Sequence, residues 1–230
     1  MENLILNSAA SGVFISLAAY GIGTLVKRKW KSALANPLLI AIILVILFLN
    51  LSGVEYETYN VSAKYLTYLL APATVSLAIP MYERMQLLKE NYAAILTGIL
   101  SGVLASLVCV LAMALVFHLS QAEYVTLLPK SVTTAIGMDI AKELGGHSEI
   151  AAAVIIITGV LGNMAAEPIC RIFAIRHPVA KGIALGTSAH AIGTAKAMEM
   201  GETEGAMSSL AIVVAGVCTV VGATVFAGLL

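Results

Sequence analysis

Long apolar runs, interrupted by short polar segments, are the feature that most limits how this sequence can fold. Several of the runs reach the roughly 20 residues that a helix needs to cross a bilayer. The chain is 60% hydrophobic and only 11% charged, with a mean hydropathy of +0.95. A water-soluble fold has no interior that could bury so many apolar runs, so the composition predicts one integral-membrane domain over residues 1–230.

The composition also argues against several classes of protein. The formal net charge is zero, which gives no electrostatic reason to expect a nucleic-acid partner. The three cysteines lie in separate apolar stretches without CxxC spacing, so we expect no disulfide framework, metal site or cofactor. The sequence contains no HExxH, paired-aspartate or GxSxG motif, and we therefore expect no enzyme activity.

The apolar runs predict an all-α bundle of about six transmembrane helices. These helices are expected near residues 4–26, 37–50, 64–82, 92–118, 148–170 and 206–230. Pro72 and Pro80 should kink or break the third of them. We expect residues 1–63 to supply scaffold helices and residues 64–230 to form repeated broken-helix units.

Residues 127–146 and 182–200 are too polar and too short to cross a bilayer comfortably. If both are re-entrant hairpins, nine of the 13 lysines and arginines face one side, one faces the other, and three lie inside the hairpins. The positive-inside rule then gives six spanning helices with both termini outside. The alternative is a continuous crossing at 127–146, which would place Arg171, Arg176 and Lys181 outside.

The two polar segments introduce units of opposite orientation. The unit 127–170 enters from outside and ends inside, whereas the unit 182–230 enters from inside and ends outside. A further stretch, residues 69–81, repeats the pattern of prolines and hydroxyls. Inverted repeats built from interrupted helices place a substrate site near the membrane midplane in many transporters, so the pattern predicts a transporter-like bundle.

The segment that begins at Leu127 carries the chemistry of an anion site. A helix starting after Pro129 would present free backbone N–H groups from about Lys130 to Thr133. Lys130 adds a positive charge, and Ser131, Thr133 and Thr134 add hydroxyl donors. A small carboxylate is the natural occupant, since a charge inside the membrane requires a partner. The alternative is that the lysine snorkels to the interface and the hydroxyls only cap the helix.

The second polar segment carries further candidates. Thr187, His190 and Thr194 follow at i, i+3 and i+7, which places them on one face of a helix, and Ser188 adjoins them. A protonated His190 could bind the substrate carboxylate or carry a coupling proton, because its reference pKa of about 6.5 lies near physiological pH. In the alternative interpretation, a neutral His190 donates to a backbone carbonyl at a helix interface.

Other polar residues are weaker candidates for ion coupling, namely Asp139, Asn163, Glu167 and Lys196. We expect ion pairs between Glu167 and Arg171 and between Lys196 and Glu199, and most pairs of this kind are structural. Two GxxxG spacings, at 98–102 and 182–186, permit close helix approach within the bundle or between protomers of a homo-oligomer.

Several of these motifs together resemble the LrgB/CidB family of bacterial membrane proteins. The resemblance is strongest between residues 127 and 205. It rests on residues 144–146, 158–162 and 177–182, and above all on two longer motifs: Leu128-Pro129-Lys130-Ser131-Val132-Thr133-Thr134 and Gly186-Thr187-Ser188-Ala189-His190-Ala191-Ile192-Gly193-Thr194. Residues 165–168 depart from the small apolar pattern expected there, so the resemblance assigns no role to Glu167.

The resemblance implies a multi-pass protein of the bacterial plasma membrane with a small LrgA/CidA-type membrane partner. Plant relatives resemble glycolate and glycerate carriers, and bacterial relatives are linked to pyruvate uptake. We therefore expect ion- or proton-coupled transport of a small monocarboxylate of the pyruvate, glycolate, glycerate or lactate class. The alternative that the family implies is an antiholin-like protein that modulates murein hydrolases and autolysis.

Overall fold

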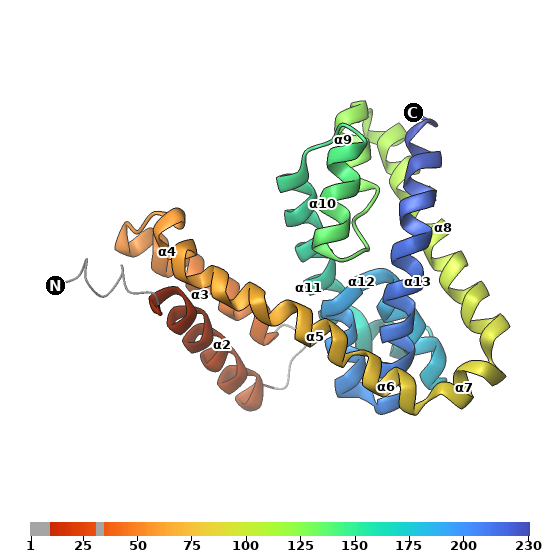
Figure 1. The fold of residues 1–230 in the computed structure, drawn as a ribbon, viewed down its shortest axis with the longest axis horizontal. Helices are drawn as coiled ribbons and strands as arrows, with labels where there is room; N and C mark the ends of the chain where they lie inside the picture. The colour runs from red at the N-terminus through yellow and green to blue at the C-terminus, as the bar shows by residue number, and fades with distance from the viewer. Residues whose placement is uncertain (1–9, 31–34) are drawn as a thin grey trace. The chain divides into compact units, whose positions relative to one another are not determined.

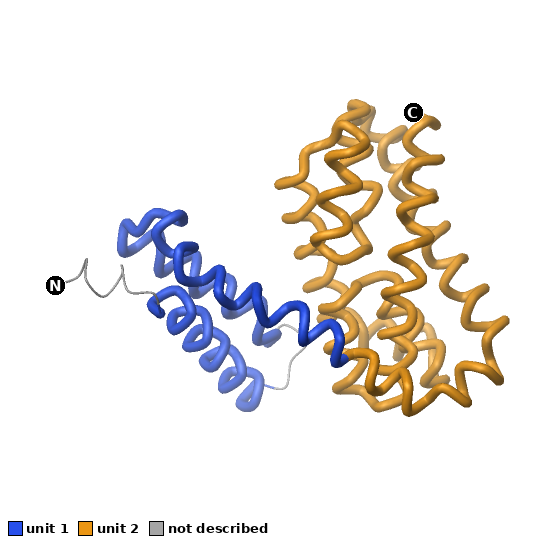
Figure 2. The backbone as a smooth tube through the Cα atoms, in the orientation of Figure 1, with its two compact units in different colours: residues 1–76 blue, residues 77–230 orange. Residues whose placement is uncertain are grey.

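The computed structural model describes residues 10–30 and 35–230, and the chain divides into two compact units. Unit 1 is residues 1–76 and unit 2 is residues 77–230 (Figure 2). Every regular element in the described part of the chain is a helix, which confirms the expected all-α membrane fold. The boundary expected near residue 64 falls within unit 1.

Long apolar helices account for most of the described chain. Four are long and apolar enough to cross a membrane: Tyr56–Glu83, Tyr92–Phe117, Ser148–Ile172 and Glu202–Ala227. The first of these is broken into short segments, as its two prolines predict. The apolar helix Pro37–Ser52 is shorter. The helix expected over 4–26 runs from Ser11 to Lys29, and its expected start lies outside the described residues.

In the described part of unit 1, polar contacts join its first helix to a later one. Its elements are α2 (Ser11–Lys29), α3 (Pro37–Ser52), α4 (Tyr56–Ala63), the 3₁₀ helix η1 (Lys64–Leu69) and α5 (Leu70–Ser76). The backbone N–H of Gly12 donates to Ser62 Oγ at 2.7 Å, and Ser16 Oγ lies 2.7 Å from Tyr59 Oη. These contacts fix α4 against the start of α2.

Unit 2 has two ends, which we name from the residues found there (Figure 1). Its helices are α6 (Ala78–Glu83), α7 (Met85–Glu90), α8 (Tyr92–Phe117), α9 (Gln121–Leu127), α10 (Thr134–Glu143), α11 (Ser148–Ile172), α12 (Pro178–Met200) and α13 (Glu202–Ala227). At the Phe226 end, Tyr124 Oη donates to the Phe226 carbonyl at 2.9 Å. At the Met200 end, Arg171, Lys181 and Met200 line one pocket.

The first polar segment is a re-entrant hairpin, as the charge distribution predicts. Helix α9 starts at the Phe226 end, residues 128–133 form an irregular tip, and α10 returns. The return is closed by a hydrogen bond of 2.8 Å from the His147 N–H to Thr126 Oγ1. Helix α11 (Ser148–Ile172) then runs from the Phe226 end to the Met200 end, where Arg171 lies in its last turn.

The second polar segment is also re-entrant. Helix α12 is broken at its centre, where Ala189 has φ −131° and ψ 16° and His190 has φ 42° and ψ −139°. Lys181 before the break and Met200 after it line the same pocket, so both arms of α12 end together. Helix α13 then crosses to the Phe226 end. Helices α11 and α13 run in opposite directions. This confirms the predicted inverted arrangement of segments 127–170 and 182–230, both of which lie in unit 2.

Glycines allow α12 to approach α8 and α13 closely. Gly98 and Gly102 of α8 face Ile183 and Thr187: a Cβ atom on Gly102 would lie 3.1 Å from Thr187 Oγ1. Gly186 of α12 faces the backbone of α13. Both GxxxG spacings therefore serve packing inside the bundle.

We predict that Gly186→Ala destabilises the protein by about 1–3 kcal/mol, the usual cost of overpacking. The added Cβ would lie 2.7 Å from Ala211 Cβ and 3.0 Å from Ser208 Cα, and neither atom can move without shifting α13. Gly216→Ala is the matched control, because its nearest neighbour would be Ile136 Cδ1 at 3.6 Å. The midpoint of thermal unfolding in detergent measures both, and equal midpoints would contradict the close crossing.

Candidate functional site

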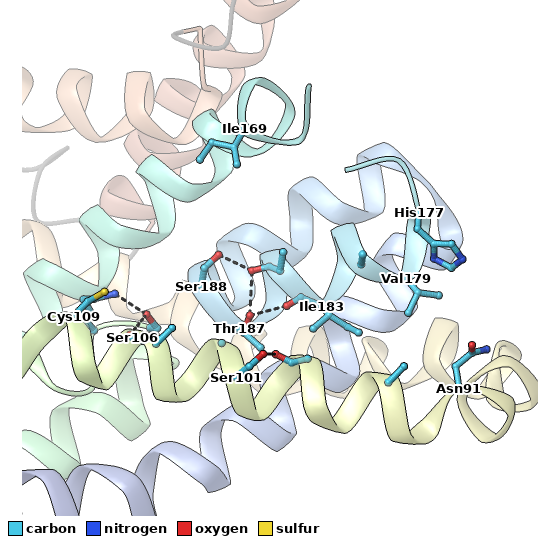
Figure 3. A pocket seen from close by; sticks show the side chains of 18 residues that line it. Asn91, Ser101, Ser106, Cys109, Ile169, His177, Val179, Ile183, Thr187 and Ser188 are labelled. Carbon is cyan, nitrogen blue, oxygen red and sulfur yellow. Dashed lines mark hydrogen bonds between the residues drawn. The ribbon is translucent and has the colours of Figure 1, made fainter. Parts of the chain in front are cut away.

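The tip of the first hairpin and the first arm of the second border one cavity of about 1050 Å³ in unit 2. Its walls are α8, the tip residues Lys130 and Ser131, the first arm of α12 and Ile169 of α11. Cys109 and Ser106 lie at one end of the cavity, and Asn91 and His177 lie at the other (Figure 3). Ligand sites in proteins usually have volumes of about 300–1,000 Å³, so this cavity can hold a small organic acid together with water.

Lys130 brings the only cationic side chain of the first hairpin tip into this cavity. Its Nζ donates to Ser131 Oγ at 3.0 Å, and Ser131 Oγ lies 3.2 Å from Ser106 Oγ of α8. Within residues 10–30 and 35–230, the structure pairs Lys130 with no carboxylate. The ammonium group therefore keeps donors available for an anionic ligand.

Thr187 and Ser188 of α12 face α8 across the cavity (Figure 3). Thr187 Oγ1 donates to the Ile183 carbonyl at 2.8 Å, and Ser188 Oγ donates to the Ala184 carbonyl at 2.6 Å. With their protons engaged in this way, both hydroxyls present acceptor lone pairs to the cavity. They suit a ligand that carries its own hydroxyl group.

The anion site expected from free N–H groups after Pro129 is not formed as predicted. The Lys130 N–H bonds the Leu127 carbonyl at 3.1 Å, and the Val132 N–H bonds the Pro129 carbonyl at 3.2 Å. These turns delay the helix, so that α10 begins at Thr134 with Thr133 as its N-cap residue. Both threonines are partly exposed, and neither is among the residues that line the cavity.

His190 and Thr194 do not line the cavity. They also do not share a helical face with Thr187, because α12 is broken at Ala189 and His190. Both are buried. His190 Nε2 lies 2.9 Å from the Ile155 carbonyl of α11, and Thr194 Oγ1 lies 2.7 Å from Ser208 Oγ of α13. These bonds tie the tip of α12 to both long helices.

A small residue of α11 creates the space for the His190 ring. A Cβ on Gly159 would lie 2.7 Å from His190 Cε1 and 2.8 Å from its Nε2. The positive φ of His190 is costly for a residue with a Cβ atom, so the surroundings must hold it in place. The ring therefore lies where the alternative interpretation of His190 requires it, next to a backbone carbonyl at a helix interface.

The weaker candidates lie outside the cavity lining. Asn163 Nδ2 donates to the Ile192 carbonyl at 2.9 Å and so joins α11 to the second arm of α12. Lys196 Nζ lies 2.5 Å from Glu167 Oε1 and 3.3 Å from Glu199 Oε2. The ion pair of Glu167 is therefore with Lys196, across two helices, rather than with Arg171 one turn away. Asp139 is exposed on α10.

The sequence did not predict that α8 forms one wall of the cavity. Small residues recur at helical spacing along α8, and the last of those that line the cavity are Ser101, Gly102, Ala105, Ser106 and Cys109. The GxxxG spacing indicates close packing there, but the hydroxyls of Ser101 and Ser106 on the same face were the signal for a polar site. Thr74 and Ser76, in the echoing stretch 69–81, instead donate to carbonyls of their own helix at 2.8 and 2.7 Å.

The described residues offer no group of three metal-ligating side chains. The arrangement thus combines one cation, several hydroxyls and mainly small apolar residues, which can bind a small organic anion without covalent chemistry.

Comparisons with known proteins agree with the resemblance. The model of the LrgB-like family matches residues 16–229. The antiholin-like protein LrgB of Bacillus subtilis (strain 168) is 40% identical over 220 residues, which cover 95% of each chain. Antiholin-like protein LrgB of Bacillus mycoides (strain KBAB4) is 40% identical over 91% of this chain and 92% of its own. No solved structure matches the chain. The chain belongs to the LrgB-like family of membrane proteins.

Proposed function

We propose that this chain is a membrane transporter of small monocarboxylates, of the class that includes pyruvate, glycolate, glycerate and lactate. The observation that carries the proposal is a cavity shared by the tip of the first hairpin and the first arm of the second, which enter from opposite ends of unit 2. This cavity contains Lys130 without a carboxylate partner in the described residues. Opposed interrupted helices around one site are the usual construction of carriers with alternating access.

In this proposal, Lys130 receives the carboxylate, and Ser106 and Ser131 hold the ammonium group and the anion in place. The acceptor oxygens of Thr187 and Ser188 receive a hydroxyl of the substrate. Thr133 and Thr134 act indirectly, by starting the return arm of the hairpin. His190 and Thr194 position the tip of α12 through their bonds to α11 and α13.

We further propose that a cation or proton accompanies the substrate. A membrane potential that is negative inside opposes entry of a monoanion by about 2.3 kcal/mol per 100 mV, so uptake requires a compensating charge. Asp139 and the cluster of Glu167 with Lys196 are ionisable groups of the two hairpin units that could respond to such an ion. We assign no enzyme activity to the chain.

A second candidate function is antiholin-like control of murein hydrolases and autolysis. The names of the relatives favour this function and mention no transport. In this proposal the chain acts by assembly, as a homo-oligomer or with an LrgA/CidA-type membrane protein. The two functions are compatible, since altered handling of a central metabolite such as pyruvate can itself change autolysis.

We propose that the protein lies in the bacterial plasma membrane, with both chain termini outside. The basic residues at the end of α2 and those at the Met200 end of unit 2 support this orientation by the positive-inside rule. Cysteine labelling at either end of the chain in intact cells tests it.

Replacing Lys130 by Gln should weaken carboxylate binding at least tenfold, since a hydrogen bond to a charged group contributes about 1.5–3 kcal/mol. The measurement is the rise in melting temperature of the detergent-solubilised chain with pyruvate, lactate, glycolate or glycerate. Lys142→Gln, an exposed lysine of α10 outside the cavity, should bind like the unchanged protein. Unaltered binding by Lys130→Gln would remove the cavity from the proposal.

Transport and assembly can be separated in liposomes that contain the purified chain. A transporter should take up labelled lactate saturably, prefer one enantiomer, and retain a small trapped dye. A pore should release the dye and pass both enantiomers equally. A protein that acts only by assembly should move no acid. If none of the four acids moves under any ion gradient, the substrate assignment is wrong and the antiholin-like function remains.

A further inference from the structure

A second, smaller pocket lies at the Met200 end of unit 2. Its volume is about 370 Å³, and it lies where α11 ends, the chain turns and α12 begins. Three basic side chains line it: Arg171, Arg176 and Lys181. It shares no lining residue with the cavity of Lys130, so its chemistry is independent of the proposed transport site.

The charge balance of this pocket is positive. Its acidic residue, Glu167, is engaged by Lys196 Nζ at 2.5 Å, a side chain that comes from the second arm of α12. Lys181 has a more distant partner, Glu204 Oε1, at 4.0 Å. In the described part of the chain, Arg176 forms no ion pair. The arginines therefore provide positive charge that nearby carboxylates do not cancel.

The position and walls of the pocket favour phosphate chemistry. Helix α11 is long and apolar enough to cross a membrane, and it ends at Ile172, next to Arg171. The ends of spanning helices lie close to the lipid headgroups. Guanidinium groups match the oxygens of phosphate with paired hydrogen bonds. Cys170, Ile175 and Met200 add apolar wall beside the cations, which suits the glycerol and upper acyl region of a lipid.

We propose that this pocket binds a phosphate group, supplied either by an anionic phospholipid headgroup or by a soluble phosphate. Basic pockets at the ends of transmembrane helices are frequent sites for anionic lipids. Arg171 and Arg176 donate hydrogen bonds to the phosphate, and Lys181 adds positive charge from the first turn of α12. Because α11 and α12 both contribute, a bound phosphate joins the spanning helix to the start of the second hairpin.

The test uses the purified full chain, stripped of lipid in a neutral detergent, and follows its melting temperature. The additions are phosphatidylglycerol, zwitterionic phosphatidylcholine and inorganic phosphate. We expect saturable stabilisation by phosphatidylglycerol but not by phosphatidylcholine if the source is lipid, and by inorganic phosphate alone if the source is soluble. Stabilisation by neither anion overturns the proposal.

Substitutions then locate the site. Arg176→Gln should weaken the affinity for whichever anion stabilises the chain about fivefold. The double variant Arg171→Gln with Arg176→Gln should weaken it about 30-fold, because each basic residue near a membrane surface contributes about 1 kcal/mol. Lys89→Gln, an exposed lysine of α7 outside both pockets, is the matched control and should behave like the unchanged chain. If the double variant does not fold, the single variant decides.

The same affinity in the arginine variants and the unchanged chain would overturn the assignment. Carboxylate binding at Lys130 should persist in these variants, so failure of one proposal is distinguishable from failure of the other.

Discussion

The need to satisfy every backbone polar group without water governs the architecture of unit 2. A helix that stops within a membrane leaves N–H and C=O groups unpaired, and this is tolerated only where protein or a water-filled cavity surrounds the break. Both breaks in unit 2 meet this condition. Residues 128–133 form their own turns and contact α8 through Ser131, and the break at Ala189 packs against Gly159 and Gly162 of α11.

Small residues make this enclosure possible. Gly159 and Gly162 of α11 leave room for His190 and Ala189, and Gly182 and Gly186 bring the first arm of α12 against α13. Larger side chains at these positions would push the tip away from its partners. The hydroxyls then supply the bonds, as Thr194 does with Ser208 across α12 and α13. The contacting faces of α11, α12 and α13 thus provide both the space for close packing and the hydrogen bonds.

Much of this fold follows from the sequence, because charge and hydropathy restrict membrane topology strongly. The distribution of basic residues predicts that 127–146 and 182–200 turn back, and the structure has both hairpins. Lys130 and Ser131 were expected at an anion site, and they do border the cavity. The opposed directions of α11 and α13 follow from the same reasoning.

Other features depended on backbone angles that residue types alone do not fix. The turns at Lys130 and Val132 moved the start of α10 to Thr134. The unusual angles of His190 turned its ring toward Ile155, away from the cavity. The role of α8 was also hidden, because Ser101 and Ser106 look like ordinary residues of an apolar helix until α12 is placed beside them.

The bonding of α12 is unequal on its different sides. Hydrogen bonds and an ion pair attach it to α11 and α13, through His190, Asn163, Thr194 and Lys196. Toward α8 it presents Ile183 and Thr187 to glycines, with no hydrogen bond between the two helices in the described residues. Toward α8, α12 is therefore held by side-chain packing alone, which restrains sliding between two helices less than directional hydrogen bonds do.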